Sequence, residues 1–178
     1  LDSGAPEVLA LVQGAREVSE AVIDSSDFVQ FTGSCATGAK VMERAARTLT
    51  PVSLELGGKD PMLVLEDADI DLAAHAAVWG AMFNAGQTCV SVERVYVVES
   101  VYDQFVAAVV DDVNKLKLGA GEGYHLGAMI DDSQVAVTER HVADALAKGA
   151  KVLTGGKRAS GSGSFYEPTV LVDVDHTM

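Results

Sequence analysis

Positive charge is scarce in this sequence, because 13 Lys and Arg stand against 26 Asp and Glu and give a formal net charge of −13. A chain this acidic repels nucleic-acid phosphates and anionic lipid headgroups, so we expect neither nucleic acid nor a membrane as a partner. Long apolar runs are missing too. Residues 73–82 are interrupted by His75 and Gly80, whereas a membrane-spanning helix needs roughly 20 apolar residues.

Cysteine and histidine are also rare, with two Cys and four His in the chain. Their scattered positions show no zinc-ligand spacing, so we expect no metal site. Cys35 and Cys89 allow one disulfide in principle, but no N-terminal stretch resembles a signal peptide. We therefore expect both thiols to stay reduced and the protein to be cytoplasmic.

Strands and helices alternate along the first third of the chain. This βαβαβ order predicts an α/β fold in which crossover helices join the strands of a parallel, Rossmann-like sheet portion. The expected elements are an apolar run at 8–12, a helix at 15–26, a strand at 28–32, a helix that opens at Gly33-Ser34 and ends at Pro51, and a strand at Val52–Leu56.

The regular alternation loosens after Gly57, so we place a domain boundary between residues 1–56 and residues 57–178. The second part is expected to form a further α/β domain. Its expected helices cover 70–83, 102–116 and 133–148, and its expected strands cover 61–65, 92–98, 151–154 and 166–174.

Several motif-like stretches lack the residues that their functions need. Residues 67–78 open like a calcium loop, but Leu72 stands where Gly is required and Val78 where Glu is required. Gly58-Lys59 lacks the glycine spacing of a phosphate-binding loop. The glycines of residues 119–123 follow a helix instead of a strand, so they do not form a dinucleotide-binding turn.

Two residues remain as candidates for chemistry. Cys89 follows a helix and the Gly-bearing loop at 84–88, although a thiol taken alone is more often a small buried side chain than a nucleophile. Glu55 lies near the end of the apolar strand Val52–Leu56, where a charge is costly to bury and a carboxylate therefore suits a general base. The carboxyl ends of parallel strands are also where α/β sheets bind ligands.

Three short segments occur in an order that resembles the NAD(P)-dependent aldehyde dehydrogenase superfamily: Phe-Thr-Gly-Ser at 31–34, Glu-Leu-Gly-Gly-Lys at 55–59 and Gly-Gln-Thr-Cys at 86–89. Each segment alone is a weak signal, but all of them in order make a chance match improbable. The resemblance covers nearly the whole chain and implies an incomplete aldehyde dehydrogenase fold. Further matching positions are Arg94, Tyr-Asp-x-Phe at 102–105 and Phe-Tyr-Glu-Pro-Thr at 165–169.

The resemblance assigns chemical roles to two residues. Cys89 resembles the family nucleophile, whose thiolate attacks the aldehyde carbon to give a thiohemiacetal, and hydride transfer to NAD or NADP then leaves a thioester. Glu55 resembles the base that activates water to hydrolyse this thioester. The Cys89 backbone N–H would help to hold the oxyanion, together with a family Asn that lies before this segment and is not Asn84.

The resemblance also implies cofactor contacts. It assigns residues 1–56 to the C-terminal part of the NAD(P)-binding domain and residues 57–178 to a truncated catalytic domain. A helix N-terminus favours the cofactor pyrophosphate through its N–H groups and partial positive charge, and Cys35 stands where the family usually has Thr. The matching positions are Gly33 and Ser34 for the pyrophosphate, Leu56 and Gly57 beside the nicotinamide, and Gly14 and Gln134 as weaker contacts.

Three parts of the family pattern have no counterpart in the chain. They are the early strands that read the adenine ribose, the oxyanion Asn, and a later Glu-Glu-x-Phe-Gly-Pro segment that holds the nicotinamide ribose. We therefore expect a piece of a longer enzyme that is inactive by itself. The parent protein is expected to oxidise a small-molecule aldehyde with NAD or NADP and to form a homo-oligomer, either a dimer or a tetramer.

Three alternatives stay open. Cys89 and Glu55 could serve a cofactor-independent cysteine hydrolase or acyl-transferase, although the Phe-Thr-Gly-Ser turn argues against this reading. A CoA-acylating enzyme would pass the thioester to a thiol, although Glu55 favours water. A non-catalytic fragment would keep both residues while serving only folding or assembly. The run at 89–94 faintly resembles succinate-semialdehyde or aromatic-aldehyde branches, which does not identify the aldehyde.

Overall fold

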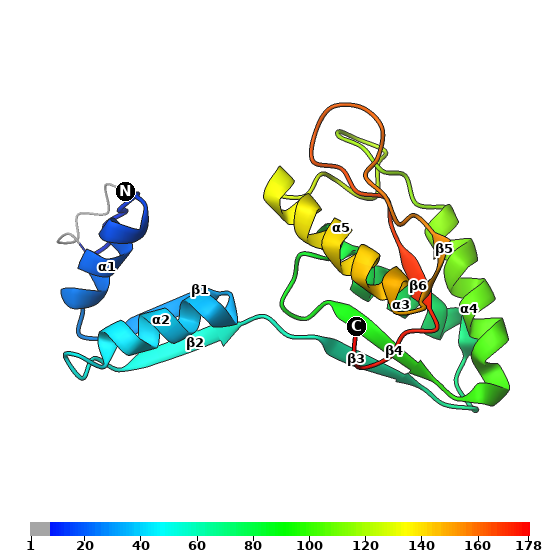
Figure 1. Ribbon diagram of the computed structural model, residues 1–178, viewed down its shortest axis with the longest axis horizontal. Coiled ribbons are helices and arrows are strands. Elements are labelled where there is room, and N and C mark those ends of the chain that lie inside the picture. Colours follow the sequence, from blue (N-terminus) through cyan, green and yellow to red (C-terminus); the bar gives the residue numbers. More distant parts are fainter. Residues whose placement is uncertain (1–7) are drawn as a thin grey trace. The chain divides into compact units, whose positions relative to one another are not determined.

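The computed structural model describes residues 8–178. The chain forms two compact units, Leu1–Gly57 and Gly58–Met178 (Figure 1). Both units combine helices with strands, and two of the three strand pairs are parallel. The predicted α/β fold class is therefore confirmed.

The first unit is a parallel strand pair with helices beside it. The strands β1 and β2 pair in register from Val29 opposite Val52 to Gly33 opposite Leu56. Helix α2 is the crossover connection between them, which is the arrangement that parallel neighbours require. The elements in order are α1 (Arg16–Asp24), β1 (Val29–Gly33), α2 (Cys35–Ala45) and β2 (Val52–Leu56).

The core of the first unit lies between its helices and its strand pair. Ile23 of α1 packs with Val41 and Ala45 of α2, and all three side chains are buried. Gly38 lets α2 approach the sheet closely, because a Cβ at this position would lie 2.8 Å from Leu56 Cδ2. This packing places the N-terminus of α2 at the carboxyl ends of β1 and β2.

The expected strand at 8–12 is wrong, because these residues have no regular secondary structure. Their apolar side chains are largely exposed, including Val8 at 80% and Leu11 at 86%. A strand is stabilised by backbone hydrogen bonds to a neighbouring strand. Within the described residues β1 pairs only with β2, so the run at 8–12 has no strand to pair with.

The second unit contains a parallel strand pair and an antiparallel one. β3 pairs with β4 in parallel, while β5 and β6 run antiparallel. The elements in order are β3 (Asp60–Val64), α3 (Ile70–Met82), the short 3₁₀ helix η1 (Phe83–Gly86), β4 (Val92–Val97), α4 (Glu99–Asn114), α5 (Asp132–Ala147), β5 (Lys151–Thr154) and β6 (Val170–Val172).

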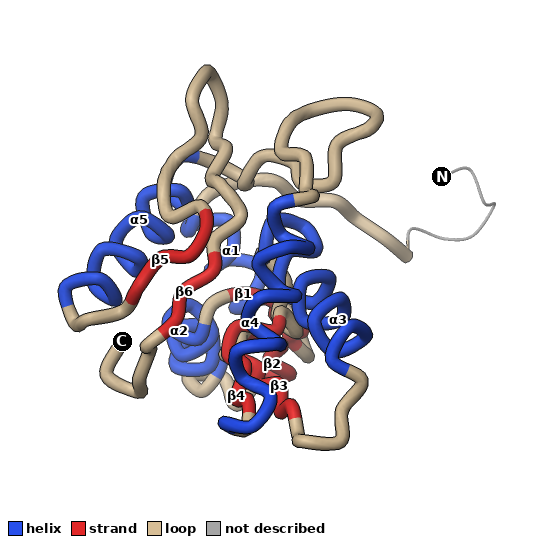
Figure 2. Tube along the Cα trace, turned by 90° about the vertical axis from the view of Figure 1, so that its right-hand side faces the viewer, coloured by secondary structure: helices blue, strands red, loops and turns tan. Residues whose placement is uncertain are grey.

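Helices α3 and α4 pack together over β3 and β4 (Figure 2). Val64, Ala74 and Phe105 are among the buried side chains of this core. Asp69 caps α3, because its carboxylate accepts a hydrogen bond from Leu72 N at 3.1 Å. This cap fixes where α3 begins and therefore which residues its C-terminal end presents to the following loop.

The last predicted strand, at 166–174, is much shorter than expected. Regular pairing covers Val170–Val172, and Tyr166 forms only an isolated bridge with Arg158. Pro168 lies between these two places and has no N–H to donate, which interrupts a ladder. None of the helices within residues 8–178 is long and apolar enough to cross a membrane.

Candidate active site

Cys89 lies in the loop that joins η1 to β4 in the second unit. Its thiol is free and exposed, so the alternative of a small buried side chain is wrong for this residue. The loop lies at the C-terminal end of α3, where the last carbonyl groups of the helix have no intrahelical partner. An exposed thiol on a loop is accessible to a small electrophile such as an aldehyde.

The backbone before Cys89 is held in an uncommon conformation. Asn84 (φ 53°), Ala85 (φ 55°) and Gly86 (φ 75°) are consecutive residues in the left-handed region. Glycine adopts it freely and Asn tolerates it, but for Ala it costs roughly 1–2 kcal/mol. Surrounding contacts must therefore hold the loop in place.

Polar side chains make these contacts. Asn84 Nδ2 donates to Gln87 O, and Gln87 Nε2 donates back to Asn84 O, both at 3.1 Å. Asn84 therefore stabilises the loop. On the far side of Cys89, Ser91 is 2% exposed, and its hydroxyl lies 3.3 Å from Gly80 O and 3.4 Å from Ala81 O of α3.

Glu55 belongs to the first unit, in β2, where it lies opposite Thr32 of β1. Its side chain is exposed, so the interpretation of a charge buried inside an apolar strand is wrong. No partner of the carboxylate is found among the described residues, which leaves both oxygens able to accept hydrogen bonds from solvent. Because Glu55 and Cys89 belong to different units, each is placed only within its own unit.

Four candidate cofactor residues lie at the strand ends of the first unit. Gly33 ends β1, and Leu56 ends β2 with Gly57 directly after it. Ser34 caps α2, since its hydroxyl oxygen accepts from Thr37 N at 3.2 Å, which agrees with the helix expected to open at Gly33-Ser34. Cys35 Sγ lies 3.8 Å from Gly57 O, so the start of α2 and the end of β2 are neighbours.

The start of α2 offers backbone donors to an anion. The first N–H groups of a helix have no intrahelical acceptor. Ser34 supplies acceptors for Thr37 and Gly38, so among the residues described the N–H groups of Cys35 and Ala36 remain for a ligand. The partial positive charge of the helix end favours a phosphate there.

The two weaker candidates lie apart from this arrangement. Gly14 precedes α1 in an exposed loop of the first unit. Gln134 is an exposed residue in the first turn of α5 in the second unit, and its N–H donates to Asp131 Oδ1 at 3.0 Å. The hydrogen bonds from Ser133 and Gln134 lower the pKa of the Asp131 carboxyl.

Arg94, one of the positions that match the family, holds the backbone at Lys59 in place. Its Nε donates to Lys59 O at 2.9 Å, and its guanidinium lies 5.9 Å from the ring centre of Tyr96. Lys59 also forms an ion pair with Glu93. These contacts fasten the beginning of β3 to β4, the strand that follows the Cys89 loop.

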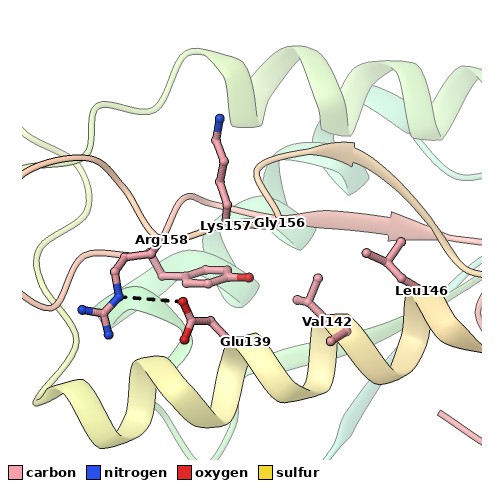
Figure 3. A pocket seen from close by; sticks show the side chains of 8 residues that line it. Glu139, Val142, Leu146, Gly156, Lys157 and Arg158 are labelled. Atoms are coloured by element: carbon pink, nitrogen blue, oxygen red, sulfur yellow. Dashed lines mark ion pairs between the residues drawn. The ribbon is translucent and has the colours of Figure 1, made fainter.

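A hollow of about 300 Å³ lies elsewhere in the second unit, against α5 (Figure 3). Val142 and Leu146 line it together with Tyr166, whose pKa is raised by burial and by the charges of Glu139 and Glu167. Arg158 at its rim pairs with Asp132 at 3.1 Å and with Glu139 at 3.8 Å. Neither a Cys nor a Ser lines the hollow, so it offers no thiol that could take the place of Cys89.

No group of His, Cys, Asp and Glu suited to a metal ion occurs in the part of the chain that the structure describes. Reasoning from the sequence did not identify Gln87 and Ser91 as parts of the site. Both lie within two residues of Cys89. Their role depends on contacts with Ile130 and with the end of α3, which the local sequence does not reveal.

Comparison with known proteins shows which proteins this chain is similar to. A family model described as "Aldehyde dehydrogenase family" matches residues 3–178. Succinate-semialdehyde dehydrogenase (NADP(+)) GabD of Escherichia coli is 47% identical over 148 residues, which cover 82% of this chain and 31% of the relative.

Solved structures agree with the sequence comparison. The crystal structure of succinate-semialdehyde dehydrogenase from Burkholderia pseudomallei is 42% identical with a TM-score of 0.93, over 98% of this chain and 38% of that one. Betaine aldehyde dehydrogenase from Staphylococcus aureus in complex with NAD+ is 37% identical with a TM-score of 0.87, over 90% of this chain and 34% of that one. The chain thus spans about a third of the length of the proteins it matches.

Proposed function

Because the chain belongs to the aldehyde dehydrogenase family, as its motifs indicate, we propose that the whole protein oxidises an aldehyde to a carboxylic acid with NAD or NADP. Cys89 is the nucleophile in this proposal and Glu55 is the base. The observation that carries the proposal is the exposed thiol of Cys89, presented on a loop whose backbone is fixed on both sides.

The start of α2 fits the pyrophosphate of a dinucleotide. Gly33 and Ser34 lie where the free N–H groups of the helix begin, and Leu56 and Gly57 end the neighbouring strand. Support for the two cofactors comes from relatives, since GabD is named for NADP(+) and the betaine aldehyde dehydrogenase structure holds NAD+. Gly14 and Gln134 stay in the proposal as weaker contacts. When bound, the nicotinamide supplies the acceptor for a hydride.

The chain's own residues perform the remaining steps. The Cys89 thiolate attacks the carbonyl carbon, and the new C–S bond leaves negative charge on the aldehyde oxygen, which the Cys89 N–H stabilises. After the carbon has lost its hydride, the substrate is a thioester of Cys89. The Glu55 carboxylate takes a proton from water, whose oxygen attacks the thioester carbon. The C–S bond then breaks, which releases the carboxylic acid and regenerates the Cys89 thiolate, and Glu55 loses its proton to solvent.

The first aldehyde to test is succinate semialdehyde. Both GabD and the Burkholderia pseudomallei enzyme are named for it, and the run Cys89-Val-Ser-Val-Glu-Arg94 faintly resembles succinate-semialdehyde or aromatic-aldehyde branches. In this proposal residues 1–56 belong to the cofactor-binding domain and residues 57–178 to the catalytic domain. Cytoplasmic localisation and assembly into a dimer or tetramer stay predictions.

The proposal is tested by following NAD(P)H formation in the whole protein with a panel of aldehydes. We expect NAD(P)H to form in step with the carboxylic acid. A cysteine hydrolase would instead cleave an ester without any NAD(P)H, and a CoA-acylating enzyme would turn over only when CoA is added. A purified, folded whole protein that reduces neither cofactor with any aldehyde would contradict the proposal.

A further inference from the structure

The loop that carries Cys89 is attached to the rest of its unit at two places. Gln87 lies two residues before the thiol and Ser91 lies two residues after it. The left-handed backbone at 84–86 cannot maintain itself, because its middle residue is Ala85. The attachments at Gln87 and Ser91 therefore decide in which direction the Cys89 backbone faces.

Gln87 uses both ends of its side-chain amide. Nε2 donates to Asn84 O at 3.1 Å, and Oε1 accepts from Ile130 N at 3.0 Å. Only this orientation of the amide satisfies both partners, because a rotated amide would set its NH₂ group against the Ile130 N–H. Gln87 thus joins the strained turn to the chain segment just before α5.

Ser91 attaches the other side of the loop. Its buried hydroxyl lies within reach of Gly80 O and Ala81 O, at 3.3 and 3.4 Å, and its N–H donates to Thr88 O at 3.2 Å. The carbonyl groups at the end of α3 lack intrahelical partners. Ser91 gives them a donor and at the same time holds the loop against the helix.

We propose that Gln87 and Ser91 are positioning residues that hold the Cys89 thiol and backbone N–H in the orientation needed for attack on the aldehyde. This inference rests on the proposed function, in which Cys89 is the nucleophile. A displacement of about 1 Å at a reacting group can lower the rate of the chemical step about 10²-fold while the substrate still binds. The effect of loosening the loop is therefore expected in the chemical step and not in binding.

The test uses the whole protein with Gln87→Glu, which keeps the size of the side chain. One carboxylate oxygen can still accept from Ile130 N, but the other would face Asn84 O with two acceptors opposed. We expect the initial burst of NAD(P)H to slow about 10- to 100-fold, with KM for the aldehyde and Kd for the cofactor within about threefold. The matched control Gln104→Glu changes an exposed Gln of α4 and should leave all three unchanged.

Hydrogen exchange of the Ile130 amide reports the contact itself. In Gln87→Ala the Ile130 N–H loses its acceptor, so we expect its exchange to become faster, while Gln104→Ala leaves it unchanged. Ser91→Ala is a smaller change, and we expect it to slow the burst in the same way, with Ser100→Ala as its control. If Gln87→Glu fails to fold, the comparison of Ser91→Ala with Ser100→Ala and the exchange of the Ile130 amide still test the positioning role.

A normal burst rate in Gln87→Glu and in Ser91→Ala would overturn the positioning role. Unchanged exchange of the Ile130 amide in Gln87→Ala would overturn it as well, because the proposed contact would not exist. Failure of the underlying function would look different, since Cys89→Ser would then remain active. An inactive Cys89→Ser beside a fully active Gln87→Glu would leave the function intact and remove only the positioning role.

Discussion

In the first unit the candidate residues around the start of α2 are placed by regular secondary structure, whereas in the second unit Cys89 is placed by side-chain hydrogen bonds. Gly33 and Leu56 end paired strands, and Ser34 caps the helix that follows. The Cys89 loop depends instead on the amide of Gln87 and the hydroxyl of Ser91. Backbone geometry therefore forms the candidate anion site, whereas polar side chains hold the candidate nucleophile in place.

The largest expected effect comes from comparing the two cysteines, Cys35 in the first unit and Cys89 in the second, because both thiols are free and exposed. We expect Cys89→Ser to lower aldehyde oxidation at least about a thousandfold, because a hydroxyl at neutral pH is a far weaker nucleophile. Cofactor binding should persist, which calorimetric titration can show. Cys35→Ser serves as the matched change and is expected to retain activity within about tenfold. NADH production by Cys89→Ser within about tenfold of the unmutated protein would rule out the nucleophile assignment.

Glu55→Gln separates the two halves of the reaction. We expect a burst of NAD(P)H to survive while steady-state turnover falls about 10²–10⁴-fold, because only thioester hydrolysis needs the base. Stopped-flow absorbance records both phases in one experiment. If the burst and the steady state fell together, Glu55 would act earlier, on the Cys89 thiol. If neither fell, its role would be structural.

The sequence predicted the first unit better than the surroundings of the nucleophile. Periodicity and capping residues gave β2 with its correct bounds and the start of α2 at Ser34, because these signals are local. The run at 8–12 misled because an apolar stretch becomes a strand only when a neighbour pairs with it. Gln87 could not be identified as a loop anchor, since its acceptor role involves Ile130, 43 residues away along the chain.

Ser34 offers a smaller test, which separates capping from cofactor binding. Ser34→Ala removes the acceptor for Thr37 N and should lower the stability of the fold by about 1 kcal/mol. Ser34→Asp keeps a capping oxygen, so thermal unfolding should be close to that of the unmutated protein, but its negative charge should weaken cofactor binding. Equal cofactor affinity in Ser34→Asp would show that the pyrophosphate does not lie at this helix end.

The smallest expected effect is a pH dependence of stability. It distinguishes the two helix caps, since α2 is capped by an uncharged Ser and α5 by the carboxylate of Asp131. The pKa of Asp131 is lowered from its ordinary value of 3.8 by hydrogen bonds from Ser133 and Gln134. Its stabilising contribution is therefore present above pH 3.8 and is lost as the pH falls through the lowered pKa. Asp131→Asn should flatten this acid part of the stability curve, whereas Ser34→Ala should not. Parallel acid melting curves for Asp131→Asn and the unmutated protein would contradict this assignment.

The most direct measurement of the central claim is mass spectrometry of the covalent intermediate. Glu55→Gln in the whole protein would be mixed with NADP and succinate semialdehyde, quenched with acid and digested. The account predicts that the peptide containing Cys89 gains the mass of one acyl group, that the peptide containing Cys35 does not, and that omission of NADP abolishes the product. Formation of NADPH without an acyl group on Cys89, or with the acyl group on Cys35, would contradict the account.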